Sequence, residues 1–322
     1  DALIVQDLAV IKLCKELGLK LPLHASVMMN VHSEAGARAL QALGVNRVIA
    51  SRDLSLTQLA LIKERTNIEL EYFIHGDMCV AHGGQCLASG ILFGKSSNRG
   101  RCLKPCRWPY AVVNHSTGTV IHDTETTGPY KLAIKDMCLY RHLPDLIQAG
   151  VDSFKIEGRM RPAEFLARIV RSYRQAIDRY LADPTGYTVD EKAWEELYTN
   201  RVRDYSPCFA FGAPGPSAFG YSGNREPMFF SHAAAEKDTP MEVCRLYGPA
   251  PIPLKPPKLA IRVASLDAVI KACDQGAEVI YVGGEAFKPN LPLTLAELST
   301  AIEYAKGCKV EVIAVTPRIT MD

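Results

Sequence analysis

Four cysteines crowd into one short stretch of the sequence, and their spacing is its clearest chemical signal. They follow the pattern Cys79-x6-Cys86-x15-Cys102-x3-Cys106, with glycines between them that allow tight turns. Four thiolates that meet at one point suit either zinc or an iron–sulfur cluster. Structural zinc sites prefer closely spaced cysteine pairs, and only Cys102 and Cys106 form one, so the spacing favours an iron–sulfur cluster. The alternative is a set of unrelated buried thiols.

Basic side chains flank these cysteines on both sides. Cationic neighbours stabilise thiolates and favour the binding of anionic substrates. A solvated loop position is the alternative for any single one of them, but five cations around two candidate ligands indicate an electropositive site. The five residues are Lys95, Arg99, Arg101, Lys104 and Arg107.

The composition is that of an ordinary globular protein. Of the 322 residues, 48% are hydrophobic and 22% charged, and the net charge of +2 does not by itself indicate a nucleic-acid binder. The sequence has no apolar run long enough for a membrane span, and its ten cysteines do not make the disulfide scaffold of a small secreted protein. We therefore expect a cytoplasmic protein. It starts at Asp1 without a signal-peptide pattern, so we expect the natural N-terminus to lie upstream.

The elements that must position the cysteines alternate between apolar strands and amphipathic helices, which is typical of a parallel sheet covered by helices. The first part of the chain predicts five strands, at residues 2–6, 21–25, 47–50, 69–74 and 153–157. The intervening and following helices are predicted at residues 8–17, 33–43, 55–65, 139–149 and 163–181. Three more strands are predicted at residues 259–263, 279–282 and 310–315, with helices at 266–275 and 295–305.

Eight strands in a βα rhythm predict an α/β fold of the (β/α)8 TIM-like barrel type. Residues 1–188 resemble strands 4–8 of such a barrel, interrupted by a Cys-rich insertion at 77–130 with a hairpin near residues 110–123. Residues 189–245 predict a small β-rich domain, 246–258 a Pro-rich linker, and 259–322 a unit like strands 1–3. The eight strands either close one barrel in permuted order or belong to two successive barrels.

Several blocks of the sequence identify a family resemblance. The segments EYFIHGDMCVAHGGQCLASG (Glu71–Gly90), NRGRCLKPCRWPY (Asn98–Tyr110) and KIEGRMR (Lys155–Arg161) resemble signature blocks of the collagenase-like peptidase U32 family. Three weaker matches, DALIVQD, LHAS and REPMFFS, occur in the right order. The resemblance extends to about residue 235, and residues 258–315 resemble the family's opening strands.

The resemblance implies a 4Fe-4S protein more than a protease, because no H-E-x-x-H or G-x-S-x-G motif is present. Better-understood members hydroxylate bases of tRNA or rRNA, or the ubiquinone ring, without oxygen, and the RNA-modifying ones use prephenate as co-substrate. Family ligands match Cys79, Cys86 and Cys102. The fourth varies, with Cys106 the best match to the RNA-modifying branch and Cys138 in reserve. A homologous partner subunit is a further expectation.

Catalytic side chains of a barrel lie at the carboxyl ends of its strands. Such positions predict catalytic roles for His75, Glu157 and Arg159; a structural histidine is the equal alternative for His75, and a buried ion pair the alternative for the other two. Substrate-binding candidates are Asp7, His24, Ser26, Arg52, Arg99 and Arg107. The family's polar residues after Ser26 and before Cys86 are replaced here, which separates this site from those of its relatives.

Three functions compete at this stage. The first is iron–sulfur-dependent hydroxylation of an RNA base, to which the arginines at 168, 171, 174 and 179 of one predicted helix would contribute phosphate contacts. A solvated helix face is the alternative for that stripe. The second is a metal-dependent peptidase, which is a hydrolase, as the family name states. The third is a non-catalytic cluster-bearing partner of another enzyme.

Overall fold

A computed structural model describes residues 1–121, 128–158, 161–221, 257–283 and 293–315. The chain divides into two compact units, of which the N-terminal one holds the described residues up to 221 and the C-terminal one those from 257 to 315. Each unit has its own hydrophobic core. No helix in the described ranges combines the length and apolar character needed to cross a lipid bilayer.

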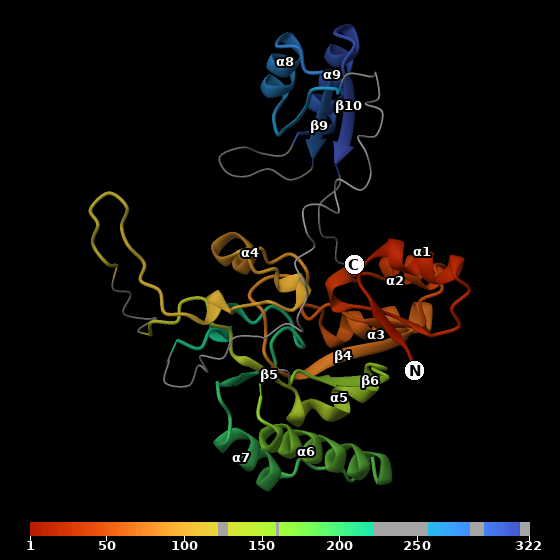
Figure 1. Cartoon of the computed structure of the whole chain (residues 1–322), viewed down its shortest axis with the longest axis vertical. Helices are drawn as coiled ribbons and strands as arrows, with labels where there is room; N and C mark the ends of the chain where they lie inside the picture. Colours follow the sequence, from red (N-terminus) through yellow and green to blue (C-terminus); the bar gives the residue numbers. More distant parts are fainter. Residues whose placement is uncertain (122–127, 159–160, 222–256, 284–292, 316–322) are drawn as a thin grey trace, which may run out of the picture. The chain divides into compact units, whose positions relative to one another are not determined.

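A seven-stranded sheet forms the centre of the N-terminal unit (Figure 1). Its main strands are all parallel to their neighbours in the order β1-β2-β3-β4-β6, and they confirm the five predicted strands. Their bounds are Leu3–Val5 (β1), Leu23–Ala25 (β2), Arg47–Ile49 (β3), Glu69–Gly76 (β4) and Ser153–Ile156 (β6). Two short strands, Asp136–Cys138 (β5) and Tyr205–Ser206 (β7), extend the sheet from the end of β4, with β5 antiparallel to β4.

The helices of this unit begin where the sequence supplies side-chain caps. Asp7, Ser33, Ser55 and Asp190 each accept a hydrogen bond from a backbone N–H of the first turn that has no partner within the helix. These four residues start the helices Leu8–Glu16 (α1), Glu34–Ala42 (α2), Leu56–Thr66 (α3) and Glu191–Thr199 (α7). Leu143–Gln148 (α5) and Ala163–Ala182 (α6) complete the set, and Figure 1 shows α6 beside α7 in green.

Helix α6 contributes one face to the main core. Its buried residues include Ile169, Tyr173, Ala176 and Tyr180, whose spacing of three and four places them on one side of the helix. Tyr173 reaches the middle of β4, where its hydroxyl donates to the backbone oxygen of Ile74 at 3.0 Å. The helix therefore supports β4 directly, and β4 is buried along all but its first residue.

The Cys-rich segment after β4 contains little regular structure. It holds a short helix, Ala88–Phe93 (α4), and the single 3-10 turns Ser97–Arg99 (η2) and Pro105–Arg107 (η3). Val113 and Val120 form an antiparallel bridge, which confirms the predicted hairpin. Further 3-10 turns lie at Val27–Met29 (η1), Tyr140–His142 (η4) and Gly215–Ala218 (η5).

The C-terminal unit is a three-stranded parallel sheet in the order β10-β9-β8. Its strands are Ala260–Val263 (β8), Val279–Gly283 (β9) and Glu311–Val315 (β10), and its helices are Leu266–Asp274 (α8) and Leu295–Gly307 (α9). Val269, Ile280 and Ala301 are fully buried between sheet and helices. The three predicted strands of this region are therefore confirmed.

The expected closed barrel is not found among the described residues, whose strands pair as two separate sheets in a mixed α/β fold. The described part of the predicted small β-rich domain also differs from expectation. Helix α7 forms there, and Leu197 and Cys208 join the main core of the N-terminal unit. The apolar face of α7 is the physical reason, because it must be buried against another element. Residues 222–245 and most of the Pro-rich linker lie outside the described residues.

Candidate functional site

The end of β4 sets the direction in which the chain enters the Cys-rich segment. Gly76, its last residue, has φ of +114°, a conformation that favours glycine. A Cβ atom there would lie 2.6 Å from the backbone oxygen of Glu157, just past the end of β6. The close approach of the two strand ends therefore requires glycine. The strand end in turn places Asp77, Met78 and Cys79 at one edge of the sheet.

A buried network of ion pairs holds the Cys-rich segment against this edge. Asp77 and Asp136 share Arg161, whose Nη2 lies 2.8 Å from Asp77 Oδ1 and 2.9 Å from Asp136 Oδ2. Arg203 contacts both carboxylates as well, and its Nε donates to Asp136 Oδ1 at 2.7 Å. Lys104, which lies between Cys102 and Cys106, pairs with Asp77. The network thus ties the second pair of cysteines to the ends of β4 and β5.

The charges in this network are mutually dependent. Burial acts to raise the pKa of Asp77, but the positive charges of Arg203, Lys104 and Arg161 outweigh it and hold that pKa well below its ordinary value. The side chains of Arg161 and Arg203 are 4% and 6% exposed. Removal of one partner would leave a charge buried without compensation.

Two predicted site residues connect the network to the cysteines. Arg52 donates from Nη1 to the backbone oxygen of Asp77 at 2.9 Å and from Nη2 to Cys79 Sγ at 3.3 Å. Arg107 is buried and donates to the backbone oxygens of Met78 and Ile134. Arg52 thus contacts one of the cysteines directly, whereas the two hydrogen bonds of Arg107 brace the loop.

The four predicted cluster cysteines occupy one neighbourhood. Burial raises the pKa of the Cys106 thiol to about 11, Arg107 opposes that shift, and the negative charges of Cys79, Cys102 and Cys86 add to it. Each of these three cysteines therefore lies near enough to Cys106 to act on its thiol. Cys102 Sγ also accepts hydrogen bonds from the backbone N–H of Lys104 at 3.3 Å and from the Ser89 hydroxyl at 3.9 Å.

The spacing of the sulfurs distinguishes between metal centres. No three of them lie within 4.8 Å of one another, since within the described ranges only His32, Asp53 and His82 meet that limit for His, Cys, Asp and Glu ligand atoms. A single zinc ion with Zn–S bonds of about 2.3 Å would bring its sulfurs to ~3.8 Å from each other. Each thiolate of a four-iron cluster binds a different iron, so a wider set suits it. The sulfurs are therefore spaced more widely than a single zinc ion bound by three or four of them would require.

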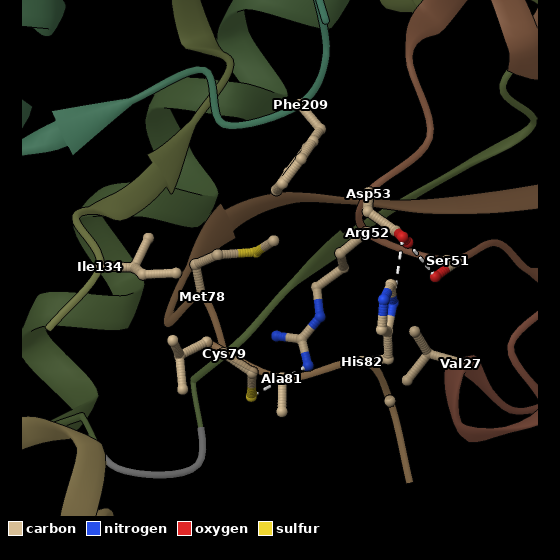
Figure 2. Close-up of a pocket in the computed structure, with 12 residues that line it drawn as sticks. Val27, Ser51, Arg52, Asp53, Met78, Cys79, Ala81, His82, Ile134 and Phe209 are labelled. Atoms are coloured by element: carbon tan, nitrogen blue, oxygen red, sulfur yellow. Dashed lines mark hydrogen bonds and ion pairs between the residues drawn. The ribbon is translucent and has the colours of Figure 1, made fainter. Parts of the chain in front are cut away.

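A cavity of about 280 Å³ adjoins Cys79 (Figure 2). Its apolar wall includes Met78, Ile134 and Phe209, and its polar wall includes Arg52, Asp53 and His82. In Figure 2 the guanidinium group of Arg52 points toward the sulfur of Cys79, and the imidazole of His82 points toward the carboxylate of Asp53. A cavity with one apolar and one charged wall suits a small ligand that has both an apolar and a charged part.

The predicted catalytic residues that the structure describes, His75 and Glu157, do not line this cavity. His75 is 2% exposed in the core. Glu157 is partly buried after β6, where its backbone N–H donates to the backbone oxygen of His75 at 2.9 Å. Arg159 lies outside the described residues. The reserve ligand Cys138 is buried in β5 with its sulfur 3.8 Å from the Tyr173 hydroxyl, so the structure gives it a core contact.

The predicted substrate-binding residues are dispersed. Asp7 and Ser26 serve as N-caps of α1 and η1. His24 is partly buried in β2, where burial and the charge of Arg47 lower its pKa. Arg99 is exposed in η2. Of these candidates, Arg52 alone is among the residues that line the described cavity.

The arginines of α6 form a less continuous basic surface than the sequence predicts. Arg174 pairs with Asp178 at 2.5 Å, and Arg179 pairs with Asp190 at 3.0 Å. Arg168 is partly buried. Acidic partners thus offset part of the positive charge that a phosphate backbone would need.

Sequence reasoning missed Asp77, Asp136 and Arg203, and it did not connect His32, Asp53 and His82. Asp77 and Arg203 are 126 residues apart, and no local pattern indicates their contact. The available signal was the position of Asp77 and Asp53, each three residues past the end of a predicted strand, where functional side chains of parallel sheets gather.

Comparison with known proteins gives these features a context. A model of peptidase family U32 matches residues 1–219. tRNA hydroxylation protein P1 of Bacillus subtilis is 33% identical over 232 residues, which cover 72% of this chain and 53% of that protein. An uncharacterized protease of Methanocaldococcus jannaschii is 41% identical over 217 residues, 66% of this chain and 52% of the relative.

A third relative is the 23S rRNA 5-hydroxycytidine synthase of Escherichia coli, which is 36% identical over 183 residues, 57% of this chain and 27% of that enzyme. The chain therefore spans about half the length, or less, of these curated relatives. No solved structure matches it.

Proposed function

Because the chain belongs to peptidase family U32, we propose that it takes part in RNA modification as an enzyme that hydroxylates a nucleobase of tRNA or rRNA. The names of two relatives, a tRNA hydroxylation protein and an rRNA hydroxycytidine synthase, support this assignment. This chain matches 53% of the length of the tRNA hydroxylation protein, so the activity of the whole protein belongs to the proposal. Its location in the cytoplasm, where RNA is modified, remains an expectation.

One observation carries the chemical part of the proposal. Four cysteines gather beside a cavity whose charged wall includes an arginine that donates to one of their sulfurs. We propose that Cys79, Cys86, Cys102 and Cys106 hold a 4Fe-4S cluster. When bound, such a cluster supplies one-electron chemistry at a position where the protein controls access.

The protein's own residues then have distinct tasks. Arg52 stabilises the thiolate of Cys79 and presents positive charge to the cavity. Met78, Ile134 and Phe209 exclude water from the opposite wall. Lys104 and Arg107 hold the cysteine-bearing loop in place. A flipped base with its phosphate, or a carboxylate co-substrate such as prephenate, has the charge and size that this arrangement selects.

We also propose the finer architecture that the family resemblance implies. The parallel strands β1, β2, β3, β4 and β6 would be consecutive strands of a (β/α)8 barrel, and β8, β9 and β10 would be opening strands of the same or a second barrel. In a single permuted barrel, β10 would precede β1.

The hydrolase alternative rests on the name of the Methanocaldococcus jannaschii relative, a protease. A non-catalytic cluster-bearing partner is the other alternative, and the homologous partner subunit expected from the sequence is a prediction of the same kind. In both alternatives the purified chain by itself does not hydroxylate RNA, whereas the proposal expects that it does.

The test is mass spectrometry of nucleosides from total RNA of a strain that lacks this gene. We expect one hydroxylated nucleoside to disappear and to return with the wild-type gene or with Cys308→Ser, which removes an exposed cysteine of the C-terminal unit. We expect no return with Cys106→Ser. An unchanged nucleoside profile would refute RNA hydroxylation.

Biochemical measurements on the same variants distinguish the alternatives. We expect the anaerobically purified wild type to carry iron and to absorb in the visible region, and Cys106→Ser to lose both; if Cys138→Ser loses them instead, the reserve ligand is the correct one. Gelatin cleavage that survives purification and responds to chelators would favour the peptidase. A nucleoside that disappears on deletion, although the purified chain does not act on RNA, would favour the non-catalytic partner.

A further inference from the structure

A second group of side chains that could bind a metal, distinct from the four cysteines, includes two residues of the cavity wall, Asp53 and His82, together with His32. His32 Nε2 is 3.2 Å from Asp53 Oδ1, and His82 Nδ1 is 3.1 Å from Asp53 Oδ2. The two imidazole rings lie edge to face, with their centroids 5.6 Å apart. One ligand atom of each residue lies within 4.8 Å of the other two, a set not matched elsewhere in the described ranges.

Hydrogen bonds around this group fix which atoms face its centre. His32 Nδ1 lies 2.5 Å from the backbone oxygen of Asn30, a contact in which the nitrogen must be the donor. A neutral His32 therefore presents the lone pair of Nε2 to Asp53. Ser51 donates to Asp53 Oδ1 from the other side. An imidazole that donates to a backbone oxygen and a carboxylate that accepts from a hydroxyl are the usual surroundings of metal ligands.

Two of the atoms at the centre have a neighbouring ligand atom but no hydrogen bond. His32 Nε2 and Asp53 Oδ2 make no hydrogen bond, although both atoms are buried and His32 as a whole is only 7% exposed. The short contact between Nε2 and the carboxylate thus lacks the direction of a hydrogen bond. Two electron-rich atoms that face each other in a buried site repel one another unless a cation lies between them. A proton or a metal ion can fill that role.

The geometry points to a site for one divalent transition-metal ion, held by His32 Nε2, the Asp53 carboxylate and His82 Nδ1. Two imidazoles and one carboxylate suit zinc or iron(II), and three protein ligands leave further positions open to water or substrate. Asp53 and His82 both line the cavity, so an open position would face the space that holds the ligand.

The loop that carries His82 is held to the segment that carries His32. The Asn30 side chain donates from Nδ2 to the backbone oxygen of Gly83 at 2.6 Å. A Cβ atom at Gly83 would lie 2.6 Å from the backbone oxygen of Val27, so glycine allows this close approach. The same contacts that position the Cys-rich segment therefore bring the second histidine to the site.

A proton shared by His32 and Asp53 is the competing occupant. The contact with Asp53 raises the pKa of His32 despite burial. Burial acts to raise the pKa of Asp53, but its contacts with His32 and Ser51 hold it at about 2, so the carboxylate is ionised at neutral pH. A shared proton is held by His32 and Asp53 alone, whereas a metal ion is also bound by His82. Substitution of His82 therefore distinguishes the two occupants.

The test is a titration of the full chain with cobalt(II) under anaerobic conditions, followed by visible and near-ultraviolet absorption. Cobalt bound by nitrogen and oxygen shows ligand-field bands without the strong near-ultraviolet absorption of cobalt–thiolate bonds, so the two groups of ligands are distinguished in one experiment. We expect one equivalent of cobalt with the nitrogen–oxygen spectrum. Its affinity should fall at least about 10-fold in His82→Gln and in Asp53→Asn.

His142→Gln is the matched control, because His142 Nδ1 lies 3.4 Å from Asp145 Oδ2 in a pair with a similarly exposed histidine. It should bind cobalt as the wild type does. His82 is 38% exposed, so its substitution should leave the fold intact, which circular dichroism checks. Absence of the nitrogen–oxygen spectrum, or an equal affinity in His82→Gln, would overturn the proposal. The result does not depend on whether the cysteines bind a cluster.

Discussion

The imidazole of His75 shows how burial limits the role of a single residue. It lies edge-on to the rings of Tyr173 and Tyr205, at centroid distances of 5.7 and 5.1 Å. Burial lowers its pKa to about 3, and the charge of Arg161 adds to the shift. A histidine with that pKa is neutral at physiological pH and is a poor proton donor there. The structural alternative for His75 is therefore favoured over the predicted catalytic role.

Substitution of His75 should change how stability depends on pH. In the unfolded chain the imidazole takes up a proton below pH about 6.5, whereas the folded protein resists protonation until about pH 3. The neutral form thus contributes stability that is fully present above pH 6.5 and is lost as the pH falls toward 3. We expect His75→Phe to reduce the slope of unfolding free energy against pH by up to about 1.4 kcal/mol per pH unit between pH 6 and 4.

Urea unfolding at several pH values measures that slope. The comparison is between slopes, so a constant loss of stability from the new side chain does not affect it. A variant whose slope equals that of the wild type would show that His75 is protonated in the folded protein.

Strand β4 is the element on which the site depends. It ends at Gly76, just before Asp77 and Cys79, and it pairs with β3, β5 and β6. Because it is buried along nearly its whole length, its position is set by packing, and the cysteine-bearing segment inherits that position. Substitutions at the strand end should therefore affect the site and the fold together.

The glycine at the end of β4 is a direct test of this dependence. Gly76→Ala would place a methyl group 2.6 Å from the backbone oxygen of Glu157 and force alanine to φ of +114°. We expect a loss of about 1–3 kcal/mol in unfolding free energy. Gly90→Ala is the control, because this helical glycine of α4 has open space around it, and alanine there should be neutral or stabilise by about 0.5–1 kcal/mol. Equal effects of the two changes would contradict the prediction.

The buried ion-pair network joins β4, β5 and the Cys-rich segment into one supported unit. Asp136→Asn should cost about 3–5 kcal/mol of unfolding free energy, because Arg161 and Arg203 would then be buried with too little negative charge. Asp178→Asn removes an exposed helical pair, whose loss should cost about 0.5 kcal/mol or less. Chemical denaturation measures both, and a small effect at Asp136 would show that water compensates the two arginines.

The molecule contains two hydrophobic cores, one in each unit. The larger core surrounds the sheet of the N-terminal unit, and the smaller one holds Val269, Ile280 and Ala301 between the three parallel strands and two helices of the other. Since each unit buries its own apolar residues, each should unfold as a cooperative structure.

Calorimetry of the full chain should separate the two cores. Ile280 is 0% exposed, and Ile280→Ala should destabilise the C-terminal unit by about 2–5 kcal/mol while the main transition keeps its midpoint. Leu70→Ala, at a fully buried position of β4, should have the opposite selectivity. A single transition that both substitutions lower would show that the two units unfold as one.

The sequence by itself located eight of the described strands, because an apolar run of four to eight residues between helical patterns has few other solutions. It missed the short strands β5 and β7. It also identified the cysteine group, since four thiols within 28 residues need only local turns of the chain to come together. The hairpin followed from local pairing of Val113 with Val120. These are all features that neighbouring residues determine.

Only the tertiary structure decided which distant residues meet. The pairing of β6 with β4 and the antiparallel β5 place Asp77, Asp136 and Arg161 together, and packing of the segment after β4 against η1 brings His82 to His32 and Asp53. Strand order depends on which apolar surfaces can be buried together, a property of the whole chain that local spacing does not encode. For the same reason, His75 ends a predicted strand in the sequence yet lies in the core of the folded protein.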